Sequence, residues 1–261
     1  MLDGWSDTAT AYDRSFARLC AGAIDGLLGN HVSVGAGPAL DVGTGTGSVV
    51  DALIRRGFAV TACDKEPSMV RFAARRYPAV DIGTAALPSL PYDDASFAVT
   101  TANFVLNHVP TPLTSARELL RVTRPGGTVA ATIWPSEPVG ALNQFWNMII
   151  RAADVAVPAG HRLPPKDDFP RNVGGFRELF CNAGATTVDC SLFSYTFRIR
   201  PDDLWAAVTA GIATIGQTYM SQTDEGRQRM QAVFTDAAAR EAPSNVLSFE
   251  STAVVAHSVV R

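Results

Sequence analysis

The chain has 261 residues, of which 47% are hydrophobic and 18% charged, enough to build one large domain or two small ones around a buried core. A formal net charge of −3 without a polybasic run argues against nucleic acid as a partner. No run of about 18 apolar residues and no signal-peptide pattern occurs, so we expect no membrane contact. The four cysteines lack metal-ligand spacing, which predicts no bound metal and suits a reducing cytoplasm.

A leading helical segment over residues 5–29 precedes runs that alternate between strand-like and helix-like patterns. Short apolar runs bounded by glycine predict buried strands, and apolar residues at helical spacing predict helices. In chain order we expect a strand at 38–42, a helix at 48–57, a strand at 58–64, a helix at 67–78, a strand at 96–103, a helix at 111–122 and a strand at 126–134. This alternation predicts βαβ units and an α/β, Rossmann-like, mostly parallel sheet with helices on both faces.

Two of these helices carry more detailed expectations. The first should stop at Gly57 and bury one face, formed by Val49, Val50, Leu53 and Ile54. The helix at 111–122 has Thr111 as a cap and Pro112 at its first position.

The second half is less regular and predicts a cap. An amphipathic segment around "FWNMII" leads into a Pro-rich loop at 156–172, which we expect to be exposed. After it we expect a helix at 176–185, a strand at 186–197, one helix at 201–219, another at 224–239 and a strand at 247–260. The helix at 201–219 should bury one face, formed by Leu204, Val208, Ile212, Ile215 and Tyr219. We therefore predict one domain over 1–261, with a core at about 30–134 and 173–261 and cap or lid segments at about 135–172 and 201–240.

The stretch "ALDVGTGTG" (39–47) places three glycines directly after the first strand. Such glycines let a backbone turn tightly and approach a ligand closely. A dinucleotide fingerprint requires G-x-G-x-x-G, but counting from Gly43 puts Ser48 at the third glycine. The alternative pattern, acid-x-G-x-G-x-G, is satisfied by Asp41, Gly43, Gly45 and Gly47. The acid suits the cationic aminoacyl part of S-adenosylmethionine better than it suits a pyrophosphate.

Three further motifs follow in order. Asp64 ends the second strand, near the roughly 20-residue offset where an acid binds ribose hydroxyls. Then come "TANFVLNHVP" (101–110) and "LLRVTRPGGTVAATIW" (119–134), with an Arg-Pro-Gly-Gly turn before an apolar strand. With the glycine loop, these motifs resemble the class I S-adenosylmethionine-dependent methyltransferases, in the branch of the ubiquinone/menaquinone-pathway enzymes and their small-molecule relatives. The resemblance covers residues 5 to 134 and implies a seven-stranded sheet, S-adenosylmethionine as cofactor and a methyltransferase.

The resemblance also implies roles for individual residues. The methionine part of the cofactor would be held by Asp41, Gly43, Thr44, Gly45 and Gly47. Asp64 would bind both ribose hydroxyls, with Lys65 and Met69 near the adenine, although Met69 is as readily a core residue. Asn103 would line the methionine pocket. Tyr12 in the leading helix would cover the cofactor beside Trp5, or both aromatic residues would only pack the helix.

The adenine-side loop "GTAALPSLPYDDASFA" departs from the family pattern, because no acid closely precedes either Leu-Pro pair. Ala85, Ala86 or Leu87 would then meet the adenine through backbone groups.

Methyl transfer from a sulfonium is an in-line displacement that depends mainly on placing the nucleophile about 3 Å from the methyl carbon. A base is required only where the acceptor must lose a proton. His108, just past the fourth strand, is the candidate base, with a hydrogen-bonded helix start as its alternative. Residues expected to line the acceptor pocket are Asn107, Trp134, Phe145, Trp146 and His161. Phe145 and Trp146 would otherwise anchor their helix, and His161 would otherwise be solvated.

The sequence thus favours an enzyme that methylates a small, partly apolar acceptor on oxygen, nitrogen or carbon, in quinone or secondary-metabolite biosynthesis. Its small-molecule acceptor is the expected partner, and the chain is a monomer or homodimer in the cytoplasm. Two alternatives stay open: a protein that binds S-adenosylmethionine without transferring methyl, and an NAD-dependent oxidoreductase. Ser48 and the Arg-Pro-Gly-Gly turn disfavour the oxidoreductase.

Overall fold

A computed structural model describes residues 8–32, 35, 37–160, 163–242 and 244–260, and the chain divides into two compact units. The sheet unit comprises residues 20–138, 163–194 and 252–261. The helical unit comprises residues 1–19, 139–162 and 195–251. The prediction of a single domain with a cap at 135–172 and 201–240 stays a prediction.

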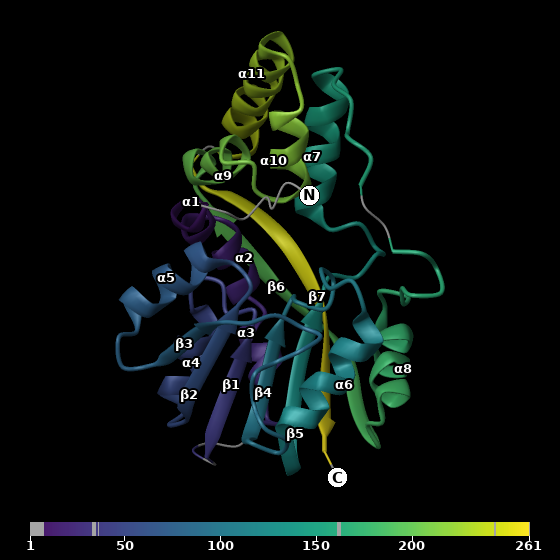
Figure 1. The fold of residues 1–261 in the computed structure, drawn as a ribbon. Coiled ribbons are helices and arrows are strands. Elements are labelled where there is room, and N and C mark those ends of the chain that lie inside the picture. The colour runs from purple at the N-terminus through teal and green to yellow at the C-terminus, as the bar shows by residue number, and fades with distance from the viewer. Residues whose placement is uncertain (1–7, 33–34, 36, 161–162, 243, 261) are drawn as a thin grey trace. The chain divides into compact units, whose positions relative to one another are not determined.

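Seven strands form one sheet in the order β3-β2-β1-β4-β5-β7-β6 (Figure 1). Their bounds are β1 Pro38–Val42, β2 Ala59–Asp64, β3 Asp81–Thr84, β4 Phe97–Asn103, β5 Thr123–Ile133, β6 Thr187–Ile199 and β7 Leu247–Val259. The ladders from β3 through β5 are parallel, whereas β7 pairs with β5 antiparallel. The expected mostly parallel α/β sheet is confirmed. Strands β6 and β7 each contribute residues to both units.

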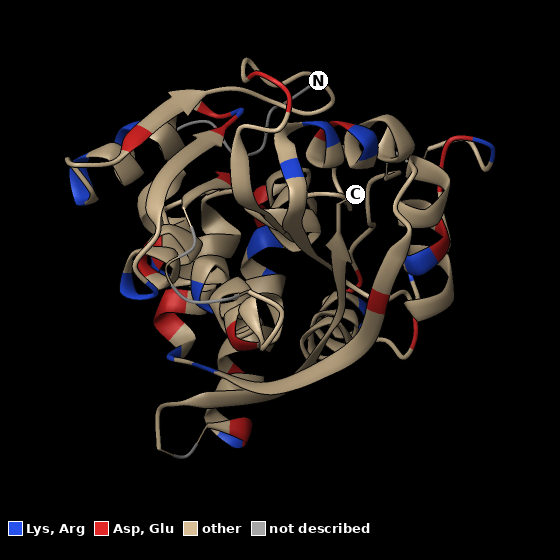
Figure 2. Cartoon of the chain, turned by 90° about the horizontal axis from the view of Figure 1, so that it is seen from below, with Lys and Arg blue, Asp and Glu red and all other residues tan. Residues whose placement is uncertain are grey.

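Helices cover both faces of the sheet unit because successive side chains of a strand point to opposite faces. Ala39 packs with α3 (Ile24–Leu28) and α4 (Ser48–Arg55) in one apolar cluster. The next residue, Leu40, packs in a second cluster with α6 (Pro112–Val122) and α8 (Val173–Ala183). Helix α5 (Pro67–Arg76) contacts β2 and β3. Strands buried on both faces are expected to lack charge, and Figure 2 shows the strands mostly tan, with both signs of charge interspersed on helices and loops.

Several expectations about these elements were wrong in detail. Ile54 is 42% exposed, so the buried face of α4 is narrower than expected. The Thr111 side chain makes no capping hydrogen bond, although Pro112 does begin α6. The short strand β3 was missed, and β5 begins at Thr123 because the Arg-Pro-Gly-Gly turn lies inside the strand as a register shift against β4.

The helical unit contains α1 (Ala9–Arg14), α7 (Ala141–Ala152), α9 (Pro201–Thr209), α10 (Ala213–Met220) and α11 (Asp224–Glu241). The single helix expected at 201–219 is two helices, because Gly211 adopts a left-handed φ of 75° and ends the first. The expected apolar face is nevertheless buried, since Leu204, Val208 and Ile215 are all below 5% exposed.

The leading segment is also broken rather than continuous. Helix α1 ends at Arg14, and α2 (Phe16–Ala21) and α3 follow as separate short helices. The hydroxyl of Ser15, between α1 and α2, donates to Ala11 O at 2.6 Å. A serine that bonds back to the preceding turn competes with the helix ladder, which accounts for the break. Trp5 lies outside the described residues. Among the described helices, none combines the length and apolar character that crossing a membrane requires.

Candidate functional site

Most of the predicted site residues of the sheet unit meet at one edge of its sheet. Strands β1, β2, β4 and β5 are parallel, so their carboxyl ends lie side by side, which is where open α/β sheets bind ligands. These ends carry the glycine loop, Asp64, Asn103 and Trp134. The structure therefore brings together residues from four separate parts of the chain.

Backbone hydrogen bonds hold the glycine loop against the end of β2. Both Gly43 N and Thr44 N donate to Cys63 O, at 2.8 and 3.0 Å. Gly45 N donates to Asp64 Oδ2 at 2.8 Å. Two positions require glycine: Gly43 and Gly47 have left-handed φ values of 70° and 90°, and a Cβ there would collide with Val105 and Tyr77, respectively. The backbone path of the glycine loop is thus fixed before any ligand binds, by its hydrogen bonds to β2 and by its close contact with Val105 and Tyr77.

Asp41 is a buried carboxylate at the base of this loop. Its Oδ1 accepts a 2.7 Å hydrogen bond from Thr101, its register partner on β4. Its Oδ2 is buried and has no hydrogen-bond partner in the described part of the chain. Burial, reinforced by the nearby Asp64, raises the pKa of Asp41 to about 7 despite the hydrogen bond from Thr101. Sequence reasoning missed Thr101, although pairing the first strand with 96–103 would have indicated it.

Two threonine hydroxyls lie in the same loop. Thr44 Oγ1 and Thr46 Oγ1 are buried and, among described residues, make no hydrogen bond of good geometry, although the Thr44 hydroxyl lies near enough to Asp41 to lower the pKa of that carboxyl. A buried polar atom without a partner is costly, so the loop is arranged for a ligand or water that supplies hydrogen bonds. Thr44 was predicted as part of the site, and Thr46 was not.

Asp64 is 8% exposed and already organises the backbone around it. Besides Gly45, its carboxylate accepts from Glu66 N at 2.9 Å. Burial raises the pKa of Asp64, while these two backbone bonds act in the opposite direction. The backbone of Lys65 also acts on this carboxylate, so of its about four lone-pair positions at least one stays available to a ligand's hydroxyl. Beside it, Lys65 is exposed, whereas Met69 is 3% exposed and packs as a core residue.

The adenine-side loop is fastened at both ends. Ala85 N donates to Asp64 O at 3.1 Å, and Ala86 forms a short bridge with Ser89. Leu87 is buried in the core, while Ala86 is exposed and Ala85 half-buried, so only the two alanines present a surface.

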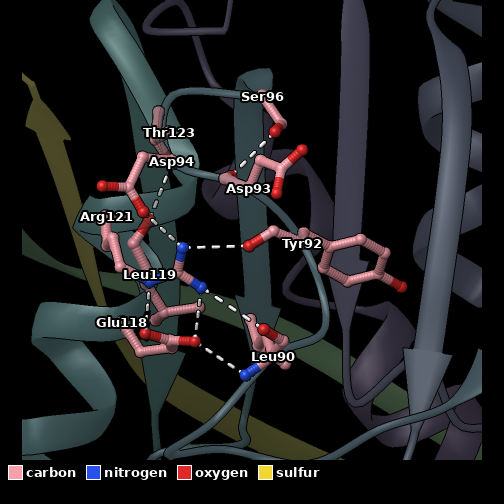
Figure 3. Close-up of polar contacts among 9 residues, drawn as sticks. All are labelled: Leu90, Tyr92, Asp93, Asp94, Ser96, Glu118, Leu119, Arg121 and Thr123. Carbon is pink, nitrogen blue, oxygen red and sulfur yellow. Dashed lines mark hydrogen bonds and ion pairs between the residues drawn. The ribbon is translucent and has the colours of Figure 1, made fainter.

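Arg121 clamps the far end of this loop from α6, as Figure 3 shows. Its guanidinium donates to the carbonyls of Leu90 and Tyr92 and pairs with Asp94 at 2.6 Å. Glu118 accepts two bonds from the same guanidinium and a third from Leu90 N at 2.6 Å. Hydrogen bonding to Arg121 lowers the pKa of Glu118. Sequence reasoning did not identify this pair.

Asn103 and Asn107 use their side chains within the sheet edge. Asn103 accepts from Thr132 Oγ1 at 2.6 Å and donates to Cys20 O at 3.0 Å. Asn107 brackets the backbone of Trp134, accepting from its N at 2.9 Å and donating to its O at 3.4 Å. The indole of Trp134 stacks on Phe104, with ring centroids 3.7 Å apart. Asn107 therefore holds Trp134 in place, and the predicted ligand contacts of both asparagines stay predictions.

His108 lies just beyond β4 and is a solvent-exposed residue. Its backbone N donates to Val105 O at 2.9 Å. The protein atoms crowded around its ring lower its pKa by desolvation, and the charges of Lys65 and Arg171 act in the same direction. A neutral imidazole at physiological pH can accept a proton. Arg171, which the sequence did not identify as a site residue, therefore lies close enough to the candidate base for its charge to act on it.

The remaining predicted residues lie elsewhere. Tyr12, Phe145 and Trp146 belong to the helical unit, and His161 lies outside the described residues. Phe145 and Trp146 are buried in an aromatic cluster with Phe234, to which both are stacked or edge-on. This packing agrees with the alternative that the two residues anchor their helix, while their role in binding the acceptor stays a prediction. The indole Nε1 of Trp146 is buried and has no partner in the described chain.

Comparison with known proteins agrees with this geometry. Residues 40–131 match the family model described as a methyltransferase domain. Over 141 residues the chain is 33% identical to a demethylmenaquinone methyltransferase of Paenarthrobacter aurescens strain TC1, covering 53% of each chain. The chain spans about half the length of the curated relatives it matches.

Solved structures show the same fold across nearly the whole chain. The YcgJ protein of Bacillus subtilis has a TM-score of 0.57 at 18% identity, covering 92% of this chain and 98% of its own. A phosphoethanolamine N-methyltransferase of Haemonchus contortus, solved with phosphomonomethylethanolamine and S-adenosylhomocysteine, also has a TM-score of 0.57, at 14% identity. It covers 99% of this chain and 58% of its own.

Proposed function

We propose, from the premise that this chain belongs to the class I S-adenosylmethionine-dependent methyltransferases, that it transfers a methyl group from S-adenosylmethionine to a small, partly apolar acceptor. The observation that carries the proposal is the cluster of buried polar atoms at the glycine loop, Asp41 Oδ2 with the hydroxyls of Thr44 and Thr46, whose hydrogen-bonding capacity the described chain leaves unfilled. The aminoacyl part of the cofactor has an ammonium group that would donate hydrogen bonds to these oxygen atoms. Asp64 would accept a hydrogen bond from the ribose hydroxyls.

The residues present thus fit the cofactor. S-adenosylmethionine supplies an electrophilic methyl carbon on a sulfonium whose leaving group is neutral. The protein's contribution is mainly to orient: the tethered loop and Asp64 fix the donor, while the bracketed Trp134 and its stacked partner Phe104 offer an aromatic wall to the acceptor.

His108 would take the proton of the acceptor. Its lowered pKa keeps the ring neutral near pH 7, so its free nitrogen can accept a proton from a hydroxyl or an acidic carbon. Lys65 and Arg171, whose charges act on the same ring, would also favour an acceptor that becomes anionic as it reacts.

A quinol-like acceptor in quinone biosynthesis agrees best with these features, with a phenolic secondary metabolite as the variant. The support is the aromatic wall and the similarity to demethylmenaquinone methyltransferases. We place the protein in a reducing cytoplasm, because the spacing of its four cysteines fits neither a disulfide framework nor a metal site.

Mass spectrometry tests the proposal directly. The protein is incubated with S-adenosylmethionine and a panel of quinols and phenols, and we expect a product heavier by one methylene together with S-adenosylhomocysteine. Cofactor binding without any product across the panel would favour a binding protein that does not transfer methyl. Titration with NAD gives the third outcome, since saturable NAD binding without S-adenosylmethionine binding would overturn the family-based mechanism.

A further inference from the structure

Two histidines and an aspartate converge in the sheet unit away from the carboxyl edge. His31 follows α3, Asp189 lies in β6 and His257 lies in β7 opposite Ala130 of β5. Ala130 belongs to the apolar cluster that packs against α3, so the group sits on the α3 face of the sheet. None of these residues has a part in the proposed methyl transfer.

Their potential ligand atoms are already close together. One nitrogen of each histidine and a carboxylate oxygen of Asp189 all lie within 4.8 Å of one another. His31 Nε2 and Asp189 Oδ2 are 3.1 Å apart. Zinc bonds of about 2.0–2.1 Å would place two tetrahedral ligands about 3.4 Å apart, so this pair is at ligand spacing.

His257 is oriented as metal-binding histidines usually are. It is 9% exposed, and its Nε2 lies 2.8 Å from Leu27 O. A carbonyl accepts only from a protonated nitrogen, so Nε2 carries the hydrogen and Nδ1 keeps its lone pair. A backbone carbonyl on the far ring nitrogen is the outer-shell contact that fixes the tautomer of a histidine ligand.

The two outer side chains have freedom to close on an ion. His31 stacks on His257, with ring centroids 4.3 Å apart and rings 18° from parallel, so the two imidazoles already lie face to face. Its side chain is 44% exposed and that of Asp189 57% exposed. With His257 held by Leu27, rotation of these two exposed side chains would bring all three ligand atoms onto one ion.

We propose that His31, Asp189 and His257 form a binding site for a divalent transition-metal ion of the zinc class. Imidazole and carboxylate ligands suit such ions, and water would fill the fourth position. The ion would join the segment after α3 to strands β6 and β7. Binding requires the folded chain, so it would stabilise the sheet unit by mass action.

Calorimetric titration of the full chain, first freed of metal with a chelator, uses zinc ion alone as the probe. We expect one ion per chain and a higher midpoint of thermal unfolding with zinc. His31→Gln and Asp189→Asn, both at exposed positions, should each weaken binding by about tenfold or more. Asp236→Asn, at an exposed position of α11, is the matched control and should bind as the parent does.

The inference is independent of methyl transfer, because neither readout uses activity. Absence of saturable zinc binding to the parent chain would overturn it. Equal zinc affinity in the parent, His31→Gln and Asp189→Asn would overturn it as well, by moving the bound ion to other residues.

Discussion

Asp64 is the residue on which cofactor affinity should depend most. Two ribose hydroxyls bonding to a charged acceptor would contribute roughly 1.5–3 kcal/mol each. We expect Asp64→Ala to weaken S-adenosylhomocysteine binding at least about tenfold, measured by calorimetry, with the fold checked by circular dichroism. Asp236→Ala, an exposed aspartate of α11, is the control. An unchanged affinity in folded Asp64→Ala would remove this residue from the site.

Asp41 should make stability depend on pH in an unusual direction. Its pKa is about 7 in the folded chain, against an ordinary 3.8, so between these values the folded state binds a proton that the unfolded state has lost. The free energy of unfolding therefore falls as pH rises across this window. Urea unfolding at about pH 5 and 7 should show a smaller fall in Asp41→Asn than in the parent. An equal fall in the free energy of unfolding in both proteins would mean that the Asp41 carboxylate is solvated and its pKa is not raised.

His108 is testable through turnover. If it takes the acceptor's proton, His108→Gln should lower kcat and leave S-adenosylhomocysteine affinity unchanged, with a loss that shrinks as pH rises and the acceptor ionises unaided. The measurement is a pH profile of turnover with the acceptor identified by mass spectrometry. If His108→Gln turned over like the parent from about pH 6 to 9, the site would act only by positioning the acceptor against the methyl group.

Single residues also show what a sequence can and cannot predict about a site. Asp41, Asp64 and the glycines were identifiable because they sit in short motifs with fixed spacing. Thr101 and Arg171 were not, because their partners are brought to them by strand pairing and by a loop, at separations that no motif encodes.

At the scale of elements, the clamp from α6 onto the adenine-side loop should contribute to stability. Arg121→Ala removes hydrogen bonds to Leu90, Tyr92, Asp94 and Glu118. The guanidinium is one-third exposed, so we expect a loss of only about 1–2 kcal/mol in urea unfolding, with weaker S-adenosylhomocysteine binding.

Arg117→Ala is the matched control for this clamp. Arg117 lies on the same helix and makes one exposed 3.3 Å bond to Asn182 O, so its loss should change little. A similar small effect in both variants would show that the loop holds its path without Arg121.

Element types were predictable where apolar periodicity was strong, and boundaries failed where one residue decided them. The apolar face from Leu204 to Ile215 is buried as expected, yet the helix breaks in its middle. Gly211 has a left-handed φ that ends α9, and periodicity carries no sign of it because the face continues into α10. Strand β3 is four residues long and half-exposed, too short for an alternation to stand out.

At the scale of the whole molecule, the loop at 156–172 should respond to ligands. We expect fast amide exchange across 156–160 and 163–167 in the free protein, slowed by S-adenosylhomocysteine with acceptor, and little change at 204–215. Phe169 departs from the exposure expected of this loop, because it is buried against Phe176, so exchange there should be slow in both states. Equal protection of 156–160 and 163–167 in both states would make the loop structural and direct the search for the acceptor entrance to Tyr12.

The position of β7 in the sheet has a consequence for synthesis. This strand lies between β5 and β6, yet the ribosome makes it after all six of the others. Until residue 247 has been translated and the following residues have emerged, β5 and β6 both present unpaired backbone edges to the cell. Open edges of this kind pair readily with other chains. We therefore expect the nascent chain to be most prone to pairing with other chains just before β7 is complete.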